Sequence, residues 1–218
     1  MDSEATTETT TGTARPTAKA ILAAACRVIV RRGFDATRIA DIAREAGTST
    51  GTVHYYFETK DDVLLAALRW ANQQPYVRVD ELVEQGDDDL TRLAKLLEVA
   101  VPYLGRPRDE YILLIELWGR ILHRPELVPD GEVVSARWRG YFFDVLRAGT
   151  ESGAFQPERH PDEVAERLIG LVDGLGFKAV LGYRWMPPER MREILLRFVA
   201  DELGVPYGEL EERARSDV

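Results

Sequence analysis

The positions of apolar residues follow a helical period along nearly the whole chain. Between residues 18 and 32 they recur at spacings of three and four, which predicts an amphipathic helix ended by Gly33. No segment shows the alternation of apolar and polar residues that is typical of a strand. The helical spacing predicts eight further helices, at residues 38–46, 50–55, 59–74, 90–104, 111–122, 133–150, 161–181 and 187–203. The chain is therefore expected to be all-α, with about nine helices.

The helices expected at residues 38–46 and 50–55 are short and separated by a tight turn. Gly47 ends the first, because glycine adopts a left-handed backbone at little cost. Thr48 or Ser49 is placed to cap the second. Both helices are too short to be stable alone, so they must pack against a neighbour. This arrangement is typical of a helix-turn-helix, which places one helix in the major groove of DNA.

The chain divides into four predicted segments. Residues 1–14 are polar and rich in threonine, which predicts a disordered tail. Residues 15–62 form the helix-turn-helix head, residues 63–205 form a larger helical domain for ligand binding and dimerisation, and residues 206–218 form a C-terminal tail. At the start of the helix that joins head and bundle, Thr59 and Asp62 have the spacing of a capping box with Asp in place of Glu.

The helices at residues 161–181 and 187–203 carry apolar stripes that suit pairing with a twin chain. The first contains Gly170, Gly174 and Gly176, and each glycine costs a helix roughly 1 kcal/mol relative to alanine. Close approach of another helix is the usual compensation. Two such helices from each of two subunits predict a four-helix homodimer interface. The alternative is that both helices complete the core of their own subunit.

Charge is distributed unevenly along the chain. The whole chain has a net charge of −9, but residues 15–60 contain eight basic and four acidic residues and carry +4. The rest therefore carries −13. A local basic surface is what attracts phosphate, and the acidic remainder keeps the bundle off the duplex. A chance fluctuation is the alternative explanation of the charge alone.

Composition argues against several other classes of protein. Cys26 is the single cysteine, so no internal disulfide can form, and we expect a cytoplasmic protein. The N-terminus lacks the apolar core of a signal peptide, and the longest apolar run, residues 21–30, is too short to span a membrane. The three histidines show no metal spacing, and no glycine-rich phosphate loop occurs. We expect no catalytic residue, metal or cofactor. An enzyme built on buried Glu116 and Asp173 is the remaining alternative.

A dense set of residues around the helix-turn-helix occurs in the order of a known DNA-binding domain. The set consists of Ala25, Arg32, Gly33, Phe34, Thr37, Ile39, Ile42, Ala43, Ala46, Gly47, Ser49, Gly51, Thr52, Val53, Tyr55, Phe57, Lys60 and Leu64. With these residues, positions 16–62 resemble the N-terminal domain of the TetR family of bacterial transcriptional repressors. The resemblance implies an all-helical dimer that is released from DNA by a small ligand. It does not identify that ligand.

Several residues of the head are candidates for DNA contact. Gly51 lets the backbone approach base edges, and the resemblance implies contacts for His54, Tyr55 and Lys60. The full candidate set is Arg15, Thr37, Arg38, Ser49, Thr50, Gly51, Thr52, His54, Tyr55, Tyr56 and Lys60. Thr37 can also be a plain helix cap, and Lys60 a solvated lysine. Because residues 50–55 contain no Arg or Lys, we expect many phosphate contacts and few contacts to bases.

The bundle is rich in aromatic residues, which line apolar ligand sites but also fill ordinary cores. The candidates for ligand binding are Tyr103, Tyr111, Glu116, Trp118, Phe142, Asp173 and Phe177. For Glu116, the alternative to ligand binding is an ion pair with Arg120. We expect a small apolar or amphipathic effector that shifts the helix at residues 59–74 and so changes the spacing of two DNA-reading heads.

The sequence is therefore interpreted as a homodimeric repressor that binds double-stranded DNA at an inverted repeat and answers to a small molecule. An activator, or a regulator that responds to a protein, is the alternative within this class. A helical binding module with a vestigial DNA head is the alternative from another class.

Overall fold

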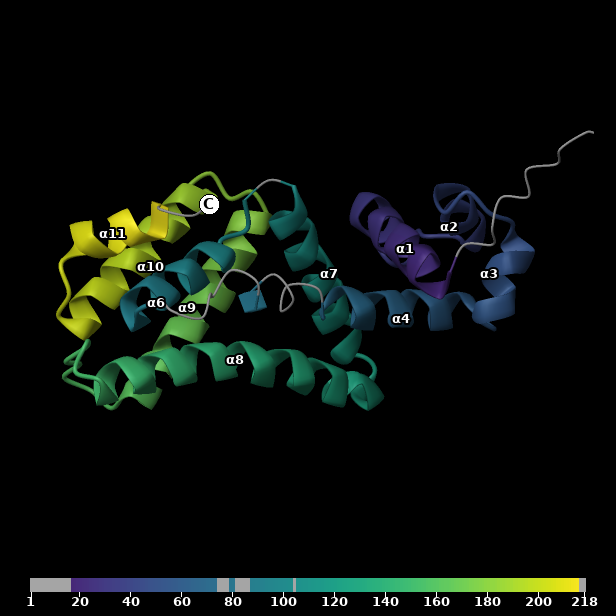
Figure 1. Cartoon of the computed structure of the whole chain (residues 1–218). Helices are drawn as coiled ribbons and strands as arrows, with labels where there is room; N and C mark the ends of the chain where they lie inside the picture. Colours follow the sequence, from purple (N-terminus) through teal and green to yellow (C-terminus); the bar gives the residue numbers. More distant parts are fainter. Residues whose placement is uncertain (1–16, 74–78, 81–86, 104, 216–218) are drawn as a thin grey trace, which may run out of the picture. The chain divides into compact units, whose positions relative to one another are not determined.

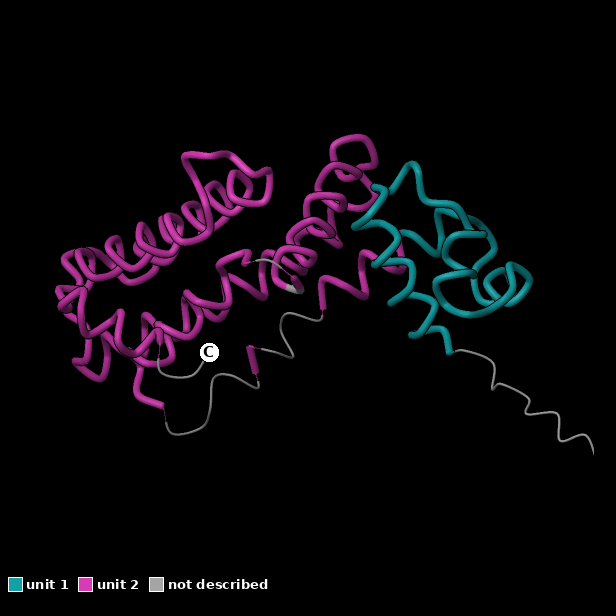
Figure 2. Tube along the Cα trace, turned by 90° about the horizontal axis from the view of Figure 1, so that it is seen from above, with its two compact units in different colours: residues 1–64 teal, residues 65–218 magenta. Residues whose placement is uncertain are grey.

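The computed structural model describes residues 17–73, 79–80, 87–103 and 105–215. Across these residues it contains ten α-helices and one short 3₁₀ helix, and no strand. The all-α prediction is confirmed. The chain separates into two compact units, residues 1–64 and residues 65–218 (Figure 2). The predicted N-terminal tail and Arg15 lie outside the described residues.

The described part of the first unit is a small helical head. Helix α1 spans Ala18–Arg32, α2 spans Ile39–Glu45 and α3 spans Thr50–Tyr56, and α2 packs against both of the others. The completely buried side chains of Ile21, Ile29, Ile42 and Val53 form its core. Cys26 is also buried, and burial raises the pKa of its thiol to about 12. It is therefore a core residue, as the apolar face of its helix predicts.

The turns of the head follow the predicted capping chemistry. Ser49, rather than Thr48, caps α3 by accepting a hydrogen bond from the Thr52 N–H at 3.1 Å. Gly47 has a φ of 65°, the left-handed conformation that lets the chain leave α2 and turn. These two features position α3 relative to α2.

Helix α4 spans Lys60–Ala71, and the boundary between the two units falls within it, after Leu64. Its start is the predicted capping box. The Thr59 N–H donates to Asp62 Oδ2 at 2.9 Å, and the Asp62 N–H donates back to Thr59 Oγ1 at 3.1 Å.

The second unit is a bundle of longer helices (Figure 1). After the end of α4 it consists of α6 (Asp89–Val99), α7 (Arg106–Ile121), η1 (Pro125–Leu127), α8 (Val128–Glu151), α9 (Pro161–Val180), α10 (Pro188–Leu203) and α11 (Tyr207–Arg215). Helix α9 packs against both α8 and α10, and α6 packs against α8 and α11. The buried core of the bundle is built mainly from α6, α8, α9, α10 and α11.

Three expectations for the bundle are wrong. Residues 206–218 do not form only a tail, because α11 buries Leu210 and Ala214 against the bundle. Helix α6 ends at Val99 rather than at residue 104, since Pro102 cannot continue it. The nearly all-apolar stretch of residues 111–122 is not the central helix. Among the described side chains of α7 only Leu113 and Leu117 are buried, whereas in α6 Leu90 and the five consecutive residues 93–97 are buried.

Candidate functional site

Helix α3 presents one face to solvent and one to the core of the head. Val53 is completely buried and fixes the helix. Thr50, Gly51, His54 and Tyr55 are exposed, and Tyr55 exposes 71% of its surface. Tyr55 and Tyr56 meet edge to face, with ring centroids 5.1 Å apart. The predicted DNA-contacting residues of α3 therefore share an accessible surface, with Thr52 half-buried beside them.

Two of the side chains predicted to contact phosphate already make hydrogen bonds within the head. Thr37 is completely buried, and its hydroxyl donates to the Gly33 carbonyl oxygen at 2.7 Å. The cap of α2 is Arg38, which is exposed and makes no side-chain capping bond, so the expected capping role of Thr37 is wrong. Lys60 is half-buried, and its Nζ donates to the Asp35 carbonyl oxygen at 2.7 Å. A phosphate would have to replace this bond.

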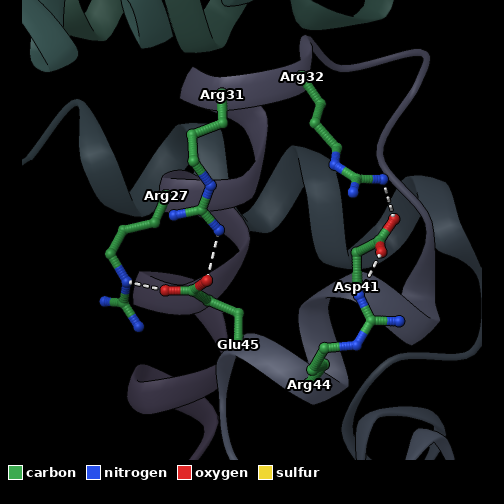
Figure 3. A network of polar contacts seen from close by, with 6 residues as sticks. All are labelled: Arg27, Arg31, Arg32, Asp41, Arg44 and Glu45. Atoms are coloured by element: carbon green, nitrogen blue, oxygen red, sulfur yellow. Dashed lines mark hydrogen bonds and ion pairs between the residues drawn. The ribbon is translucent and has the colours of Figure 1, made fainter.

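An arginine-rich network joins α1 to α2 (Figure 3). Arg27 and Arg31 converge on Glu45, with Arg27 Nε 2.7 Å from the carboxylate. Arg32 and Arg44 converge on Asp41 at 2.8 and 3.1 Å. Hydrogen bonds from Arg27 and then Arg31 hold the pKa of Glu45 below its ordinary value. Four guanidinium groups thus share two carboxylates, which leaves the head with excess positive charge.

The network is exposed, so its contribution to stability is small. Its arginine side chains are 50–74% accessible, and ion pairs of this kind contribute about 0–1 kcal/mol each. Its larger effect is electrostatic, because a positive field on the head attracts phosphate from a distance. The acidic partners also limit how many arginines are available to DNA at once.

The second unit contains a partly open cavity with a free volume of about 60 Å³. Its walls come from the end of α4, the end of α6, and from α7, α8 and α9. The lining residues are Asn72, Val99, Ala100, Pro107, Glu110, Tyr111, Leu114, Val134, Trp138, Phe142, Ile169, Val172 and Asp173. The walls are mostly apolar, with a few polar groups at defined places, as is usual for small-molecule sites.

Three of the seven predicted ligand-binding residues, Tyr111, Phe142 and Asp173, lie in the walls of this cavity. The other four do not line it. Trp118 and Phe177 stack on each other with centroids 5.3 Å apart. Glu116 lies 3.5 Å from Arg120, which is the alternative ion pair. Tyr103 packs against the buried core.

Glu110, Asn72 and Trp138 also line the cavity and are not among the predicted ligand-binding residues. Asn72 follows the end of α4 and is buried, and its side chain donates to the Leu68 carbonyl oxygen at 2.8 Å. An asparagine that directly follows the apolar pattern of a helix is a sequence signal that could have marked Asn72 as a polar lining residue. Trp138 belongs to the aromatic residues of the bundle that composition marks as possible lining, whereas Glu110 is an acid at the edge of an apolar run and gave no signal of its own.

Tyr111 and Asp173 both line the cavity, and the charge of Asp173 acts on the Tyr111 hydroxyl. The Tyr111 hydroxyl donates to the Ala100 carbonyl oxygen at 2.8 Å. Burial, and then the charge of Asp173, raise the pKa of Tyr111 above its ordinary range, so the hydroxyl remains a donor. Gly176 allows this placement, since a methyl group there would come within 2.5 Å of the Tyr111 ring.

Asp173 keeps access to solvent although it lines the cavity, which places it at the mouth. Desolvation by the surrounding walls raises the pKa of its carboxyl to about 6. Within the described part of the chain, this carboxylate makes no hydrogen bond or ion pair. Because Asp173 is exposed, water screens its charge, and the raised pKa reflects only partial desolvation.

Neither a metal centre nor a membrane span occurs in the residues that the structure describes. No group of three or more His, Cys, Asp and Glu side chains is placed to hold a metal ion. None of the described helices combines the length and the apolar character needed to cross a bilayer.

The two units match two family models. Residues 21–67 match the model for bacterial regulatory proteins of the tetR family, and residues 90–204 match the C-terminal model of BetI-type transcriptional repressors. The second match alone covers more than half of the chain.

Individual relatives agree with these models. A transcriptional regulator of Saccharomonospora viridis, solved in complex with choline, is 35% identical with a TM-score of 0.77, over 84% of this chain and 94% of that one. The regulator PksA of Bacillus subtilis is 27% identical over 83% of this chain and 87% of its own length. The repressor KstR2 of Mycobacterium tuberculosis is 25% identical over 66% of this chain and 72% of its own length. The chain therefore belongs to the TetR family of bacterial transcriptional regulators.

Proposed function

We propose that this regulator is a cytoplasmic repressor that binds an inverted-repeat operator as a homodimer and leaves it when a small molecule enters the cavity of the second unit. The observation that carries the proposal is the exposed face of α3, which is fixed from behind by Val53. Such a helix can enter a major groove without further rearrangement of the head.

The chemistry of the head supports binding that depends mainly on phosphates. Because α3 contains no Arg or Lys, the bidentate guanine contact that is common in DNA readers is absent from this helix. Thr50, His54 and Tyr55 remain for contacts to base edges or the backbone, and Arg38 lies exposed at the start of α2. Affinity should therefore fall steeply with salt, as counterions compete for phosphate.

A homodimer through residues 161–181 and 187–203 is supported by the exposed face of α9. Gly170 and Gly174 lie on this face, and a methyl group at either position would meet nothing within 4 Å in the same chain. A second copy of the helix can therefore approach closely. In α10 most apolar side chains, including Leu195 and Val199, are taken up by the core of the subunit, so α9 supplies the larger share of the proposed interface.

A small-molecule effector is supported by the cavity and by the relative that contains choline. Asn72, at the end of α4, lines the cavity, and Arg69 in the last turn of α4 forms a two-armed ion pair with Asp130 of α8. We infer that a ligand which displaces α8 or Asn72 moves α4, the helix that runs from one unit into the other. That movement would change the position of the head.

DNA binding can be tested by fluorescence anisotropy with the duplex that flanks the protein's own gene and with a shuffled duplex of equal length. We expect selective binding to the first duplex, with two chains per inverted repeat in sedimentation velocity. Tyr55→Ala should weaken this binding about tenfold, the order of one lost base contact. Tyr183→Ala is the matched control, because Tyr183 is an exposed tyrosine of the second unit.

The result that would contradict the proposal is equal binding to both duplexes at low salt, or binding that Tyr55→Ala leaves unchanged. Either outcome would favour a helical binding module whose DNA head is vestigial.

A further inference from the structure

Helix α11 lies outside the matched C-terminal model, which ends at residue 204, yet it is closely packed in the bundle. It lies along α6 and beside α10 (Figure 1). Leu210 and Ala214, one helical turn apart in α11, are buried in the same apolar cluster as Leu93 and Leu97 of α6. Helix α11 therefore completes the apolar core on one side of α6.

The N-terminal end of α6 is held by Arg213 of α11. Asp88 caps α6 by accepting a hydrogen bond from the Thr91 N–H at 2.8 Å, and the Arg213 guanidinium forms an ion pair with the same carboxylate. Arg213 also donates to the Thr91 hydroxyl at 2.8 Å. Glu209, one turn earlier in α11, lies 3.0 Å from Arg213 and orients it. The cap of α6 thus depends on a side chain of α11.

The C-terminal end of α6 is held through Arg192 of α10. The Arg192 guanidinium forms an ion pair with Glu98, in the last turn of α6, and lies 3.6 Å from Glu211 of α11. Only 16% of the Arg192 side chain and 9% of the Glu98 side chain are exposed. A pair this buried adds little net stability, because desolvation offsets the attraction between the charges. Its clearer effect is to fix the end of α6 against α10 and α11.

This fixed end of α6 forms part of the cavity wall. Val99 and Ala100 directly follow Glu98 and line the cavity, and the Ala100 carbonyl oxygen accepts the hydrogen bond from Tyr111. A shift of Glu98 would therefore shift two lining residues. The Arg192–Glu98 pair prevents that shift as long as α10 and α11 stay in place.

The end of α4, another wall of the same cavity, is held less firmly. Helix α6 packs against α8, α10 and α11, whereas no described helix of the second unit packs against α4 to a comparable extent. Asn72 lines the cavity just after α4, and the exposed Arg69–Asp130 pair connects α4 to α8. A group that expands the cavity should displace the wall with the weaker attachment.

We propose that α11 is a brace that makes α6 the fixed wall of the cavity, with Arg192 as the positioning residue, so that an entering ligand displaces the end of α4 instead of α6. This inference rests on the proposed function, because it concerns how occupation of that cavity acts on α4.

The brace can be released without leaving a buried charge unpaired. Glu98→Gln combined with Arg192→Met removes both charges and keeps side chains of similar length, so the protein should stay folded. Arg190→Met combined with Glu193→Gln is the matched control. It removes an exposed ion pair of 2.6 Å that lies within α10.

A larger side chain in the cavity can stand in for a ligand. Val172 of α9 lines the cavity, and α9 packs against both α8 and α10, so Val172→Phe should press on the other walls. Hydrogen–deuterium exchange of the full chain, without DNA, measures which wall yields. With the brace intact, exchange should become at least about threefold faster in residues 68–73 and stay unchanged in residues 93–100.

In the brace-released background, Val172→Phe should instead accelerate exchange in residues 93–100, whereas the control pair should keep the first pattern. Faster exchange in residues 93–100 while the brace is intact, or one pattern in both backgrounds, would overturn the proposal. Val172→Leu adds less bulk at the same position and gives the same comparison if phenylalanine prevents folding.

Operator binding by the same variants separates this proposal from the proposed function. Val172→Phe should weaken operator binding several-fold, and release of the brace should restore part of it. The expected exchange pattern in a protein that binds no operator would refute the repressor and support the brace. Operator binding together with the opposite exchange pattern would refute only the brace.

Discussion

At the scale of single residues, Asp173 shows how a partly desolvated acid can reduce stability. Its pKa is about 6 in the folded protein and 3.8 in the absence of burial. The folded protein therefore binds more protons between these two values, so stability falls as pH rises through this window. Because the side chain is exposed, water reduces the cost that remains above about pH 6.

Asp173→Asn is therefore expected to raise the melting temperature of the ligand-free protein at pH 7.5 and to raise it less at pH 5. The amide has nearly the shape of the acid but carries no charge to desolvate. Differential scanning calorimetry of the wild-type protein and the variant at the two pH values measures this difference in melting temperature. A lower melting temperature for the variant at pH 7.5 would show that the carboxylate has a stabilising partner instead.

At the scale of helices, glycines in the same helix have different roles. In α8, Gly149 is buried, and a methyl group there would overlap the ring of Phe155, itself one of the largest fully buried side chains. Gly140, in the same helix, has no neighbour within 4 Å of such a methyl group. The sequence offers no means of telling these two glycines apart.

Gly149→Ala is expected to lower the free energy of unfolding by about 1–3 kcal/mol, because the added methyl group overpacks the core. Gly140→Ala should raise it by up to about 1 kcal/mol through helix propensity. Urea denaturation measures the free energy of unfolding of both variants. Similar changes in the two would contradict the different environments of Gly149 and Gly140.

At the scale of the whole molecule, α4 runs from the first unit into the second, and Arg69 is its clearest attachment to the bundle. Arg69 Nε and Nη2 each lie 2.8 Å from a carboxylate oxygen of Asp130, and these bonds raise the pKa of Arg69 above its ordinary value. The arginine is half-exposed, so the pair contributes only about 0–1 kcal/mol to stability. Its expected role is to couple α4 to α8.

Arg69→Ala should therefore change the melting temperature little but reduce several-fold the release of DNA by a ligand that fills the cavity. The charge-swapped variant, Arg69→Asp with Asp130→Arg, should restore much of the response. The measurement is the ratio of operator affinities with and without a ligand, and the first compound to try is choline, which is bound in the Saccharomonospora viridis relative. Undiminished release in Arg69→Ala would mean that the ligand signal reaches the head by another route.

The sequence by itself determined the features that depend on near neighbours. Helical periodicity, the Ser49 cap and the Thr59–Asp62 capping box each involve residues within four positions of one another, and the structure confirms them. The exposed face of α3 could also be read from the sequence, because Val53 is the aliphatic residue among the polar and aromatic residues of this helix, and it is buried.

Only the tertiary structure decided which side chains meet across helices. The burial of Thr37 against Gly33 depends on the turn between α1 and α2, and the separation of Asp173 from Glu116 depends on how α7 and α9 are rotated about their axes. Rotation and offset are set by the fit of many side chains from distant parts of the chain. A periodic pattern shows which face of a helix is buried, but not which residue lies opposite it.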